Sequence, residues 1–167
     1  MLVQSRTTLT FAPCRRGAVS NRRLIVCDTG PLVSACNRRE GRRHDFAVRL
    51  LSALGRRVIV PWPVYVEVHL VLRARGHARG ALVFAHALLD GTHVLDRPTD
   101  AEHRRALQLL ERYETAGLDL GDAMVMAMAE ARKALILTWD FRHFRASAPA
   151  RGRHWPLLVQ EHEVPAP

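Results

Sequence analysis

Short runs of apolar residues recur along the chain and are separated by longer segments with helical spacing. The runs at 24–27, 58–60 and 134–138 are nearly continuous, and a weaker one covers 92–95. A continuous apolar run is typical of a parallel strand that is buried on both faces. Because parallel neighbours need long crossover connections, which are usually helical, the pattern predicts an α/β fold. We expect a parallel β-sheet of about four to five strands, sandwiched by helices on both faces.

The segments between these runs have apolar residues at helical spacing and end at glycines. Gly55, Gly76, Gly91 and Gly117 each follow such a segment, which is where a helix commonly ends. Asp119 is well placed to cap the helix that follows it. The predicted helices cover residues 32–36, 46–54, 64–75, 81–89, 99–116 and 120–133.

The length of the chain and its apolar content predict a single domain. The chain has 167 residues, of which 48% are hydrophobic, and this is enough to bury one core. We expect the domain to cover residues 24–160, followed by a short tail at 161–167. The preceding residues, 1–23, contain five arginines and no acidic residue. They are expected to be a disordered basic arm or the product of a start codon assigned too early, with Val19 as the alternative start.

The net charge of the chain is positive and bears on its partner. Lys and Arg number 25 against 16 Asp and Glu, which gives a net charge of +9. This sign favours contact with a polyanion such as RNA, because cationic side chains neutralise phosphates and release counterions. Since Lys133 is the only lysine, a GC-rich genome explains the abundance of arginine equally well.

No segment of the sequence predicts secretion or membrane insertion. The chain lacks the apolar centre of a secretory signal and the roughly 20 apolar residues of a membrane span. We therefore expect a soluble, cytoplasmic protein without a membrane partner. The cysteines, Cys14, Cys27 and Cys36, are odd in number and lack metal-binding spacing, which favours reduced structural thiols.

Aspartates follow two of the apolar runs. Asp28 comes directly after 24–27, and Asp140 follows 134–138 after one tryptophan. Because the carboxyl ends of parallel strands meet at one edge of a sheet, both side chains should project from the same edge. Each aspartate also has a simpler interpretation as the N-cap of the next helix, and the sequence leaves both interpretations open.

Two further acids lie in apolar helices. Glu67 is flanked by valines at helical spacing, where a charge needs a cation or a buried partner, such as Arg73 or Arg75. Asp122 begins a helix that is apolar on all sides and hence buried, and its methionines are expected to pack in the core. If the acids converge, their repulsion favours a bound cation, and hard oxygen ligands select Mg²⁺ or Mn²⁺. Such a cation supports hydrolysis of a phosphodiester.

The four acids lie in four short sequence motifs that follow one another along the chain. The motifs are 26–32, 61–68, 118–123 and 137–144, the last of which reads Leu-Thr-Trp-Asp-Phe-Arg-His-Phe. In these segments the chain resembles the PIN-domain family, and in particular the VapC-type toxins of type II toxin–antitoxin systems. The resemblance covers residues 24–159 and implies a single PIN-like domain.

The resemblance also implies an activity, a cofactor and partners. The activity is Mg²⁺-dependent cleavage of structured RNA such as tRNA or rRNA by an endoribonuclease, with Mn²⁺ as a substitute ion. The partners are a cognate antitoxin, which inhibits the enzyme, and a second copy of the chain in a homodimer. The residues that match the metal-site acids are Asp28, Glu67 and Asp122, with Asp140 as the fourth acid and Thr138 as the hydroxyl that supports it.

Four other residues near these motifs have two interpretations each. Asp119 either caps the following helix or adds negative charge at the rim of the site. Arg142 and His143 either contact phosphate or pack on the surface after the strand. Trp139 either stacks on a base or packs against the edge of the sheet.

Other enzyme classes fit the sequence less well. A haloacid-dehalogenase phosphatase needs a second Asp two residues after the first, where this chain has Gly30. A receiver domain needs a lysine that Lys133 is poorly placed to supply. A zinc site built on Glu67 and His69, or on His143 with a later histidine, lacks the usual ligand spacing.

The alternative to a nuclease is a non-catalytic module with the PIN fold that binds RNA or docks to a partner. In such a module the acids would be structural. The presence of all four carboxylates favours the nuclease. Metal-dependent RNA cleavage that is lost in the Asp28→Asn variant would exclude the alternative.

Overall fold

A four-stranded parallel sheet forms the centre of the protein, which we describe from a computed structural model of residues 23–167. The strands are β1 (Ile25–Cys27), β2 (Val58–Pro61), β3 (Val94–Asp96) and β4 (Leu135–Leu137), in the order β3-β2-β1-β4. The predicted α/β fold is confirmed, and each strand overlaps a predicted apolar run. The expected arm lies outside the described residues, apart from Arg23.

Strand β1 is the central strand and is buried along its whole length. Ile25 pairs with Val58 of β2 on one side and with Leu135 of β4 on the other. Next to β4, an isolated parallel bridge joins Ile136 to Leu157. The sheet therefore has four full strands and a single further bridge at the β4 edge.

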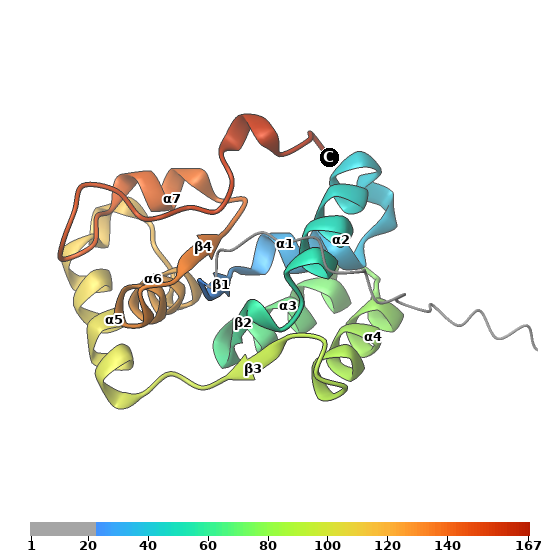
Figure 1. Cartoon of the computed structure of the whole chain (residues 1–167), viewed down its shortest axis with the longest axis horizontal. Helices are drawn as coiled ribbons and strands as arrows, with labels where there is room; N and C mark the ends of the chain where they lie inside the picture. Colours follow the sequence, from blue (N-terminus) through green and yellow to red (C-terminus); the bar gives the residue numbers. More distant parts are fainter. Residues whose placement is uncertain (1–22) are drawn as a thin grey trace, which may run out of the picture.

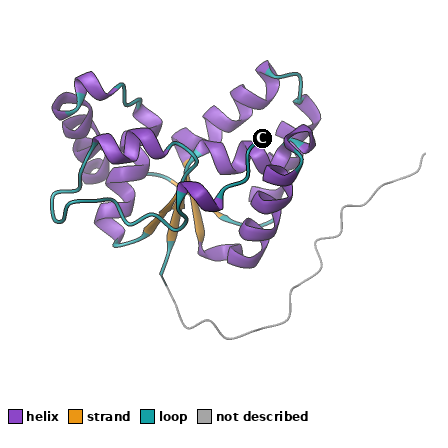
Figure 2. Cartoon of the chain, turned by 90° about the horizontal axis from the view of Figure 1, so that it is seen from above, coloured by secondary structure: helices purple, strands orange, loops and turns teal. Residues whose placement is uncertain are grey.

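The seven α-helices of the described part of the chain lie in two groups on either side of the sheet (Figures 1 and 2). One face carries the helices that connect β1, β2 and β3, and the other carries those that connect β3 to β4. None of the helices in residues 23–167 is long and apolar enough to cross a membrane. The helices are α1 (Thr29–Cys36), α2 (Arg42–Leu54), α3 (Trp62–Ala74), α4 (Ala78–Leu89), α5 (Asp100–Arg112), α6 (Leu120–Arg132) and α7 (Phe141–Ala146).

Helix α6 is the most deeply buried of these helices. Its residues from Gly121 to Ala129 are all buried, as predicted for a helix that is apolar on every side. Met124, Met126 and Met128 are each at most 1% exposed, and they belong to the hydrophobic core as expected. The helix contacts both β1 and β4, and Asp122 in its first turn lines the same cleft as Asp28 and Asp140, which follow these strands.

The order of the strands places a crevice at the carboxyl ends of β1 and β4. From β1 the chain proceeds to β2 and then β3 in one direction, and it then returns to the opposite side of β1 as β4. The connections after β1 and β4 consequently leave toward different faces of the sheet. In open α/β sheets this reversal creates the crevice in which ligands bind.

Some predicted boundaries were wrong. The helix expected at 99–116 ends at Arg112, and a separate 3₁₀ turn covers Glu114–Ala116. The reason is Tyr113, whose hydroxyl accepts a hydrogen bond from the backbone N–H of Ala148 at 3.1 Å and is thereby tied to the loop after α7. Its backbone leaves the helical region at φ −116°.

An ion-pair network joins α5, α6 and β3 on the face opposite α1 to α4. Arg132 Nε lies 2.7 Å from Glu102 Oε1, and Arg132 NH1 lies 2.6 Å from Asp96 Oδ2. Glu102 is only 5% exposed. Burial by itself raises the pKa of this carboxyl, but the hydrogen bonds from Arg132 and Thr99 outweigh burial and hold it below its usual value. Arg132 therefore compensates a buried negative charge.

Replacing Arg132 by alanine is expected to destabilise the fold. The loss should be about 3 kcal/mol, because Glu102 would remain buried without its cation. Unfolding in urea near neutral pH measures the effect. Arg104→Ala, at an exposed position of α5, is the matched control and should cost no more than about 0.5 kcal/mol. Equal losses in the two variants would contradict the role assigned to the ion pair.

Candidate functional site

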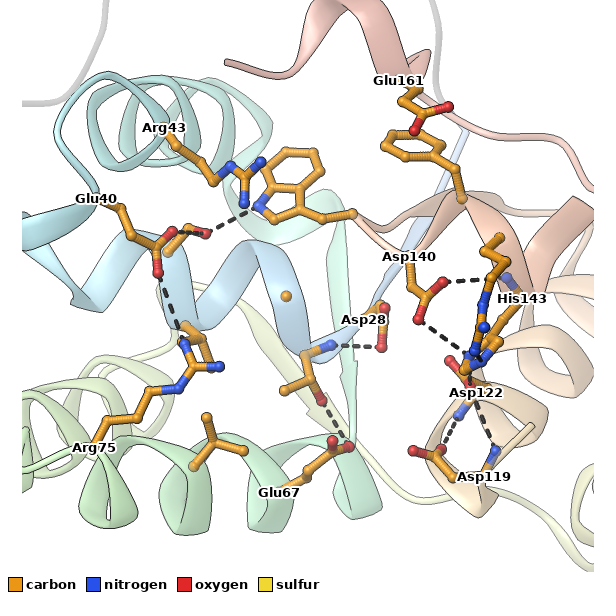
Figure 3. Close-up of a pocket in the computed structure, with 18 residues that line it drawn as sticks. Asp28, Glu40, Arg43, Glu67, Arg75, Asp119, Asp122, Asp140, His143 and Glu161 are labelled. Carbon is orange, nitrogen blue, oxygen red and sulfur yellow. Dashed lines mark hydrogen bonds and ion pairs between the residues drawn. The ribbon is translucent and has the colours of Figure 1, made fainter. Parts of the chain in front are cut away.

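A cleft of about 540 Å³ opens at the carboxyl ends of β1 and β4 (Figure 3). The structure brings all four predicted acids into this cleft, although they come from four separate segments of the chain. Four other residues singled out from the sequence also line it, namely Asp119, Trp139, Arg142 and His143. The charged or titratable residues of the lining are Asp28, Glu40, Arg43, Glu67, Arg75, Asp119, Asp122, Asp140, Arg142, His143 and Glu161.

Asp28 lies at the floor of the cleft, directly after β1, and is 6% exposed. Its Oδ2 accepts a hydrogen bond from the Thr138 hydroxyl at 2.7 Å, and its Oδ1 accepts one from the Thr29 backbone N–H at 2.6 Å. Burial raises the pKa of Asp28 to about 7, although both hydrogen bonds oppose the shift. The charges of Asp122 and Glu67 raise it further. Asp28 is thus held in a place that disfavours its charged form.

Glu67 reaches the cleft from α3 and accepts a hydrogen bond from the Thr29 hydroxyl at 2.8 Å. A salt bridge to Arg73 or Arg75 was the alternative interpretation, but Arg75 lies 3.9 Å from Glu40 instead. Burial raises the pKa of Glu67, and the neighbouring Asp119 adds to this shift while the bond from Thr29 opposes it.

The absence of a side chain at Gly121 leaves room for the carboxylates of Glu67 and Asp119. A Cβ atom at this position would lie only 2.8 Å from Glu67 Oε2 and 3.1 Å from Asp119 Oδ1. Real Cβ atoms do not come this close to another heavy atom without some shift. Glycine therefore lets the Glu67 carboxylate lie against the first turn of α6, beside Asp122.

Asp119 and Asp122 form a capping box at the start of α6. Asp119 is the N-cap, as predicted, and its Oδ1 accepts a hydrogen bond from the Asp122 backbone N–H at 2.8 Å. It also lines the cleft, so the interpretation as a cap and that as a rim charge both describe it. Burial raises the pKa of Asp122 to about 6, with the charge of Asp119 adding to the shift and His143 opposing it.

Asp140 lies at the mouth of the cleft, where its side chain is 43% exposed. It is the N-cap of α7 and accepts a hydrogen bond from the backbone N–H of His143 at 3.2 Å. Its own backbone N–H donates to the Thr138 hydroxyl at 2.8 Å. Asp28 and Asp140 are therefore N-caps and also line one shared cleft, so the two interpretations of each residue are compatible.

His143 has partners that the sequence did not indicate. Its Nδ1 lies 2.6 Å from Asp122 Oδ2 and 3.1 Å from Asp140 Oδ2, so the ring joins the two carboxylates (Figure 3). Arg142 is exposed, and one of its amino groups lies 3.0 Å from His143 Nε2. A spacing of three residues does place Asp140 and His143 on one face of α7, and this was the available signal. The link to Asp122 depends on the tertiary fold.

Four charged residues of the lining were not predicted to belong to the site. Glu40 belongs to a 3₁₀ turn, Arg43 lies in α2 and Arg75 is the C-cap of α3. Glu161 follows the segment that bridges to β4. The residues expected to form a tail, 161–167, fold back against the domain, because Arg43 Nε donates to the Pro165 carbonyl at 2.8 Å. No local pattern in the sequence indicates these approaches.

The donor atoms of the cleft suit a hard cation, although no preformed metal cage is present. Carboxylate oxygens are the ligands that Mg²⁺ and Mn²⁺ prefer. The raised pKa values of Asp28 and Asp122 arise from burial and from neighbouring carboxylates, a situation that a bound cation would relieve. Within residues 23–167, however, no three His, Cys, Asp or Glu side chains already lie close enough together to hold a metal ion.

Comparison with sequence models of known families identifies the family to which the chain belongs. The sequence model of the PIN domain matches residues 25–148, from β1 to just beyond α7. The chain belongs to the PIN domain family. This assignment confirms the resemblance inferred from the sequence motifs. A sequence comparison with curated proteins found no match for this PIN domain.

Solved structures of toxins share the fold. Mycobacterium tuberculosis VapC20, described as a sarcin-ricin loop cleaving toxin, has a TM-score of 0.59 at 22% identity, with 66% of this chain and 84% of that chain covered. A toxin–antitoxin complex from Klebsiella pneumoniae gives 0.53 at 20% identity, with coverage of 72% and 89%. Rickettsia felis VapBC2 bound to a promoter DNA fragment gives 0.51 at 16% identity, with coverage of 70% and 87%. At these identities the likeness is one of fold.

The raised pKa of Asp28 has a consequence for the stability of the metal-free PIN domain. Its pKa of about 7 lies above the value near 4 of an unfolded chain, so the folded state binds the additional proton. The corresponding stability is present at low pH and is lost as the pH rises through about 7. Asp28→Asn should therefore melt several degrees above the parent at about pH 8 without divalent ions, and the difference should narrow near pH 5.

Thermal melts at the two pH values, in the presence of a chelator, measure this effect. Asp90→Asn is the control, because Asp90 is exposed and lies outside the cleft, and it should leave the melting temperature nearly unchanged at both values. A melting temperature of Asp28→Asn below that of the parent at the higher pH would contradict the assigned electrostatic cost.

Proposed function

We propose that this PIN domain is a metal-dependent endoribonuclease and the toxin component of a type II toxin–antitoxin system. The observation that carries the proposal is the convergence of Asp28, Glu67 and Asp122 in one cleft at the reversal of the sheet. Two of these acids have strongly raised pKa values. Maintaining buried carboxylates that repel one another costs stability, which is expected where they serve chemistry.

The residues that would hold Mg²⁺ or Mn²⁺ are Asp28, Glu67 and Asp122, with Asp140 as a fourth acid at the mouth. When bound, such an ion supplies hydroxide from water and stabilises the charge that develops on the phosphate. The protein contributes the orientation of its ligands. Thr138 and Thr29 donate hydrogen bonds to Asp28 and Glu67, and such partners fix the direction of metal-binding carboxylates.

His143 has a supporting role in this proposal. Its ring lies between Asp122 and Asp140 and lowers their mutual repulsion when it is protonated. It therefore orients these two acids of the cleft. Arg142 beside it is exposed and can contact phosphate.

We infer that the substrate is RNA, with tRNA and rRNA as the specific candidates. The net charge of +9 favours a polyanionic substrate. VapC20, which has the same fold, is described as cleaving the sarcin-ricin loop, and this supports a structured RNA target. The chemistry of metal-assisted phosphodiester hydrolysis requires no nucleophile from the protein.

Cleavage of total RNA by the purified protein tests the nuclease. We expect discrete fragments with Mg²⁺ or Mn²⁺, no fragments with a chelator, and at least a 100-fold slower reaction for Asp122→Asn, roughly as for loss of an essential catalytic group. Asp90→Asn serves as the matched control and should cleave like the parent. RNA that is bound but stays intact with every metal would favour the non-catalytic module.

We further propose that a cognate antitoxin inhibits the enzyme by inserting a cationic side chain into the acidic cleft. An arginine would there replace the charge of the metal and pair with Asp28 and Asp122. Two structures with the same fold are complexes of a toxin with its antitoxin, which supports a partner of this kind. A homodimer is also proposed on the basis of the family resemblance.

Purification from its own host should therefore yield the tagged protein together with a small second chain. We expect its RNA cleavage to be suppressed at first and to rise when the partner is removed under denaturing conditions and the toxin is refolded. The Asp28→Asn and Asp122→Asn double variant should retain the partner less tightly. Full activity of the freshly purified, single-chain protein would refute the inhibited complex.

A further inference from the structure

The two ends of the cleft differ in chemistry. Figure 3 shows Asp119, Asp122, Asp140 and His143 toward the α6 and α7 side, whereas two cationic residues lie with Glu40 toward α2 and α3 on the other side. Those cations are Arg43 and Arg75, and both line the same cleft. The acidic end suits a metal-bound phosphate, and the basic end suits the phosphates of a chain that continues beyond it.

Trp139 is a lining residue of this cleft that the proposed metal chemistry does not use. It is half-buried and lies in the chain between Thr138, which binds Asp28, and Asp140. A base that contacts its indole ring would therefore belong to a nucleotide close to the phosphate at the acids. Aromatic rings stack on any of the RNA bases, because every base has a π-face.

The indole ring of Trp139 is held in one orientation. Its Nε1 donates to Ser34 Oγ at 3.1 Å, and the Ser34 hydroxyl donates in turn to Glu40 Oε2 at 2.6 Å. The Phe46 ring lies 5.9 Å from it with an interplanar angle of 37°. An added Cβ at Gly30 would be 3.3 Å from Trp139 Cδ1, so the edge of the ring lies against the first turn of α1. A ring held in this way loses little freedom on binding a base.

The two arginines at this end of the cleft retain the capacity to bind phosphate. Arg43 uses Nε for the Pro165 carbonyl, which takes one of the five donors of a guanidinium. Arg75 lies at 3.9 Å from Glu40 and its side chain is 55% exposed, so this pair is loose. Guanidinium groups match the geometry of phosphate oxygens.

We propose that Trp139, Arg43 and Arg75 form a nucleotide subsite, in which the indole stacks on a base beside the scissile phosphate and the arginines contact the adjoining phosphates. The inference rests on the proposed nuclease function and extends it to the binding of the RNA strand. The subsite selects unpaired or splayed nucleotides, since a base inside a duplex cannot expose its face to the ring.

Cleavage of a short single-stranded RNA of defined sequence, scanned with one abasic nucleotide at a time, tests the subsite. With the parent enzyme, one abasic position next to the cut should raise KM about 5- to 100-fold. Trp139→Leu should raise KM for the intact RNA by a similar factor. In this variant, an abasic nucleotide next to the cut should cause no further increase in KM. Trp139→Phe should recover most of the affinity, because a ring is restored.

Trp62→Leu is the matched control, because Trp62 is 40% exposed on α3 and is not part of the cleft lining. It should leave unchanged both KM for the intact RNA and the abasic profile, which is the dependence of KM on the position of the abasic nucleotide. A flat abasic profile with the parent enzyme, or an unaltered profile in a folded Trp139→Leu variant, would overturn the subsite. The scan with the parent keeps the proposal testable if Trp139→Leu does not fold.

The salt dependence of RNA binding tests the arginines. Arg43→Gln and Arg75→Gln should each lower the slope of log affinity against log salt by about 0.7, as for one lost contact to single-stranded phosphate. Arg49→Gln and Arg73→Gln, at exposed positions of the same helices that do not line the cleft, are the controls. If the salt slopes of Arg43→Gln and Arg75→Gln equal that of the parent, the two arginines do not contact phosphate in the subsite.

Failure of the nuclease proposal is distinguishable from failure of the subsite. If the parent cleaves no RNA with any metal, the nuclease proposal fails, and quenching of tryptophan fluorescence by the same RNA still tests the subsite. Quenching that is lost in Trp139→Leu and kept in Trp62→Leu supports stacking on Trp139. Equal quenching in both variants overturns it.

Discussion

The hydrogen bond from the Thr138 hydroxyl to Asp28 joins the ends of the two strands between which the sheet reverses direction. The same hydroxyl accepts the backbone N–H of Asp140, and the Asp28 backbone N–H donates to the Leu137 carbonyl at 2.9 Å. These bonds hold the loops that follow β1 and β4 together at their base, before the loops separate toward opposite faces. The cleft, its acidic floor and the position of Trp139 all depend on this junction.

The folded state disfavours the charged form of the acids in the cleft. Asp28 is buried with two hydrogen bonds that only partly offset its desolvation, and Glu67 and Asp122 lie close enough to add repulsion. At Gly121 the absence of a side chain leaves room for the Glu67 carboxylate beside the first turn of α6. By contrast, the buried Glu102 is fully compensated by Arg132 on the far side of the sheet. The structural carboxylate Glu102 is thus neutralised by a cation. The carboxylates of the cleft, for which we propose a function, are not neutralised in this way.

Much of the fold could be predicted from the sequence because its determinants are local. Apolar runs identified all four strands, and the capping residue Asp119 identified the start of α6. The four acids of the cleft were found in the same way, since each stands at the end of a strand or on an apolar helix. The end of α5 was missed because Tyr113 is tied to a loop 35 residues later.

The remainder of the site depends on contacts between distant segments. The pairing of His143 with Asp122, the bond from Thr29 to Glu67 and the approach of Arg43 to the cleft have no periodic signature. They arise from the close packing of α1, α3, α6 and α7 around the reversal of the sheet. A sequence motif can name the acids of such a site, whereas the partners that orient them require the three-dimensional fold.

The segment that follows α7 gives the protein a particular order of assembly. Leu157 bridges to β4, Glu161 lines the cleft, and the Pro165 carbonyl accepts a hydrogen bond from Arg43 of α2. Figure 1 shows this C-terminal segment, in red, passing from α7 toward α2. These residues are synthesised after every other part of the cleft. During translation, the strands and the acidic floor can fold while this wall is still missing. The complete cleft consequently forms only after this C-terminal segment has emerged from the ribosome.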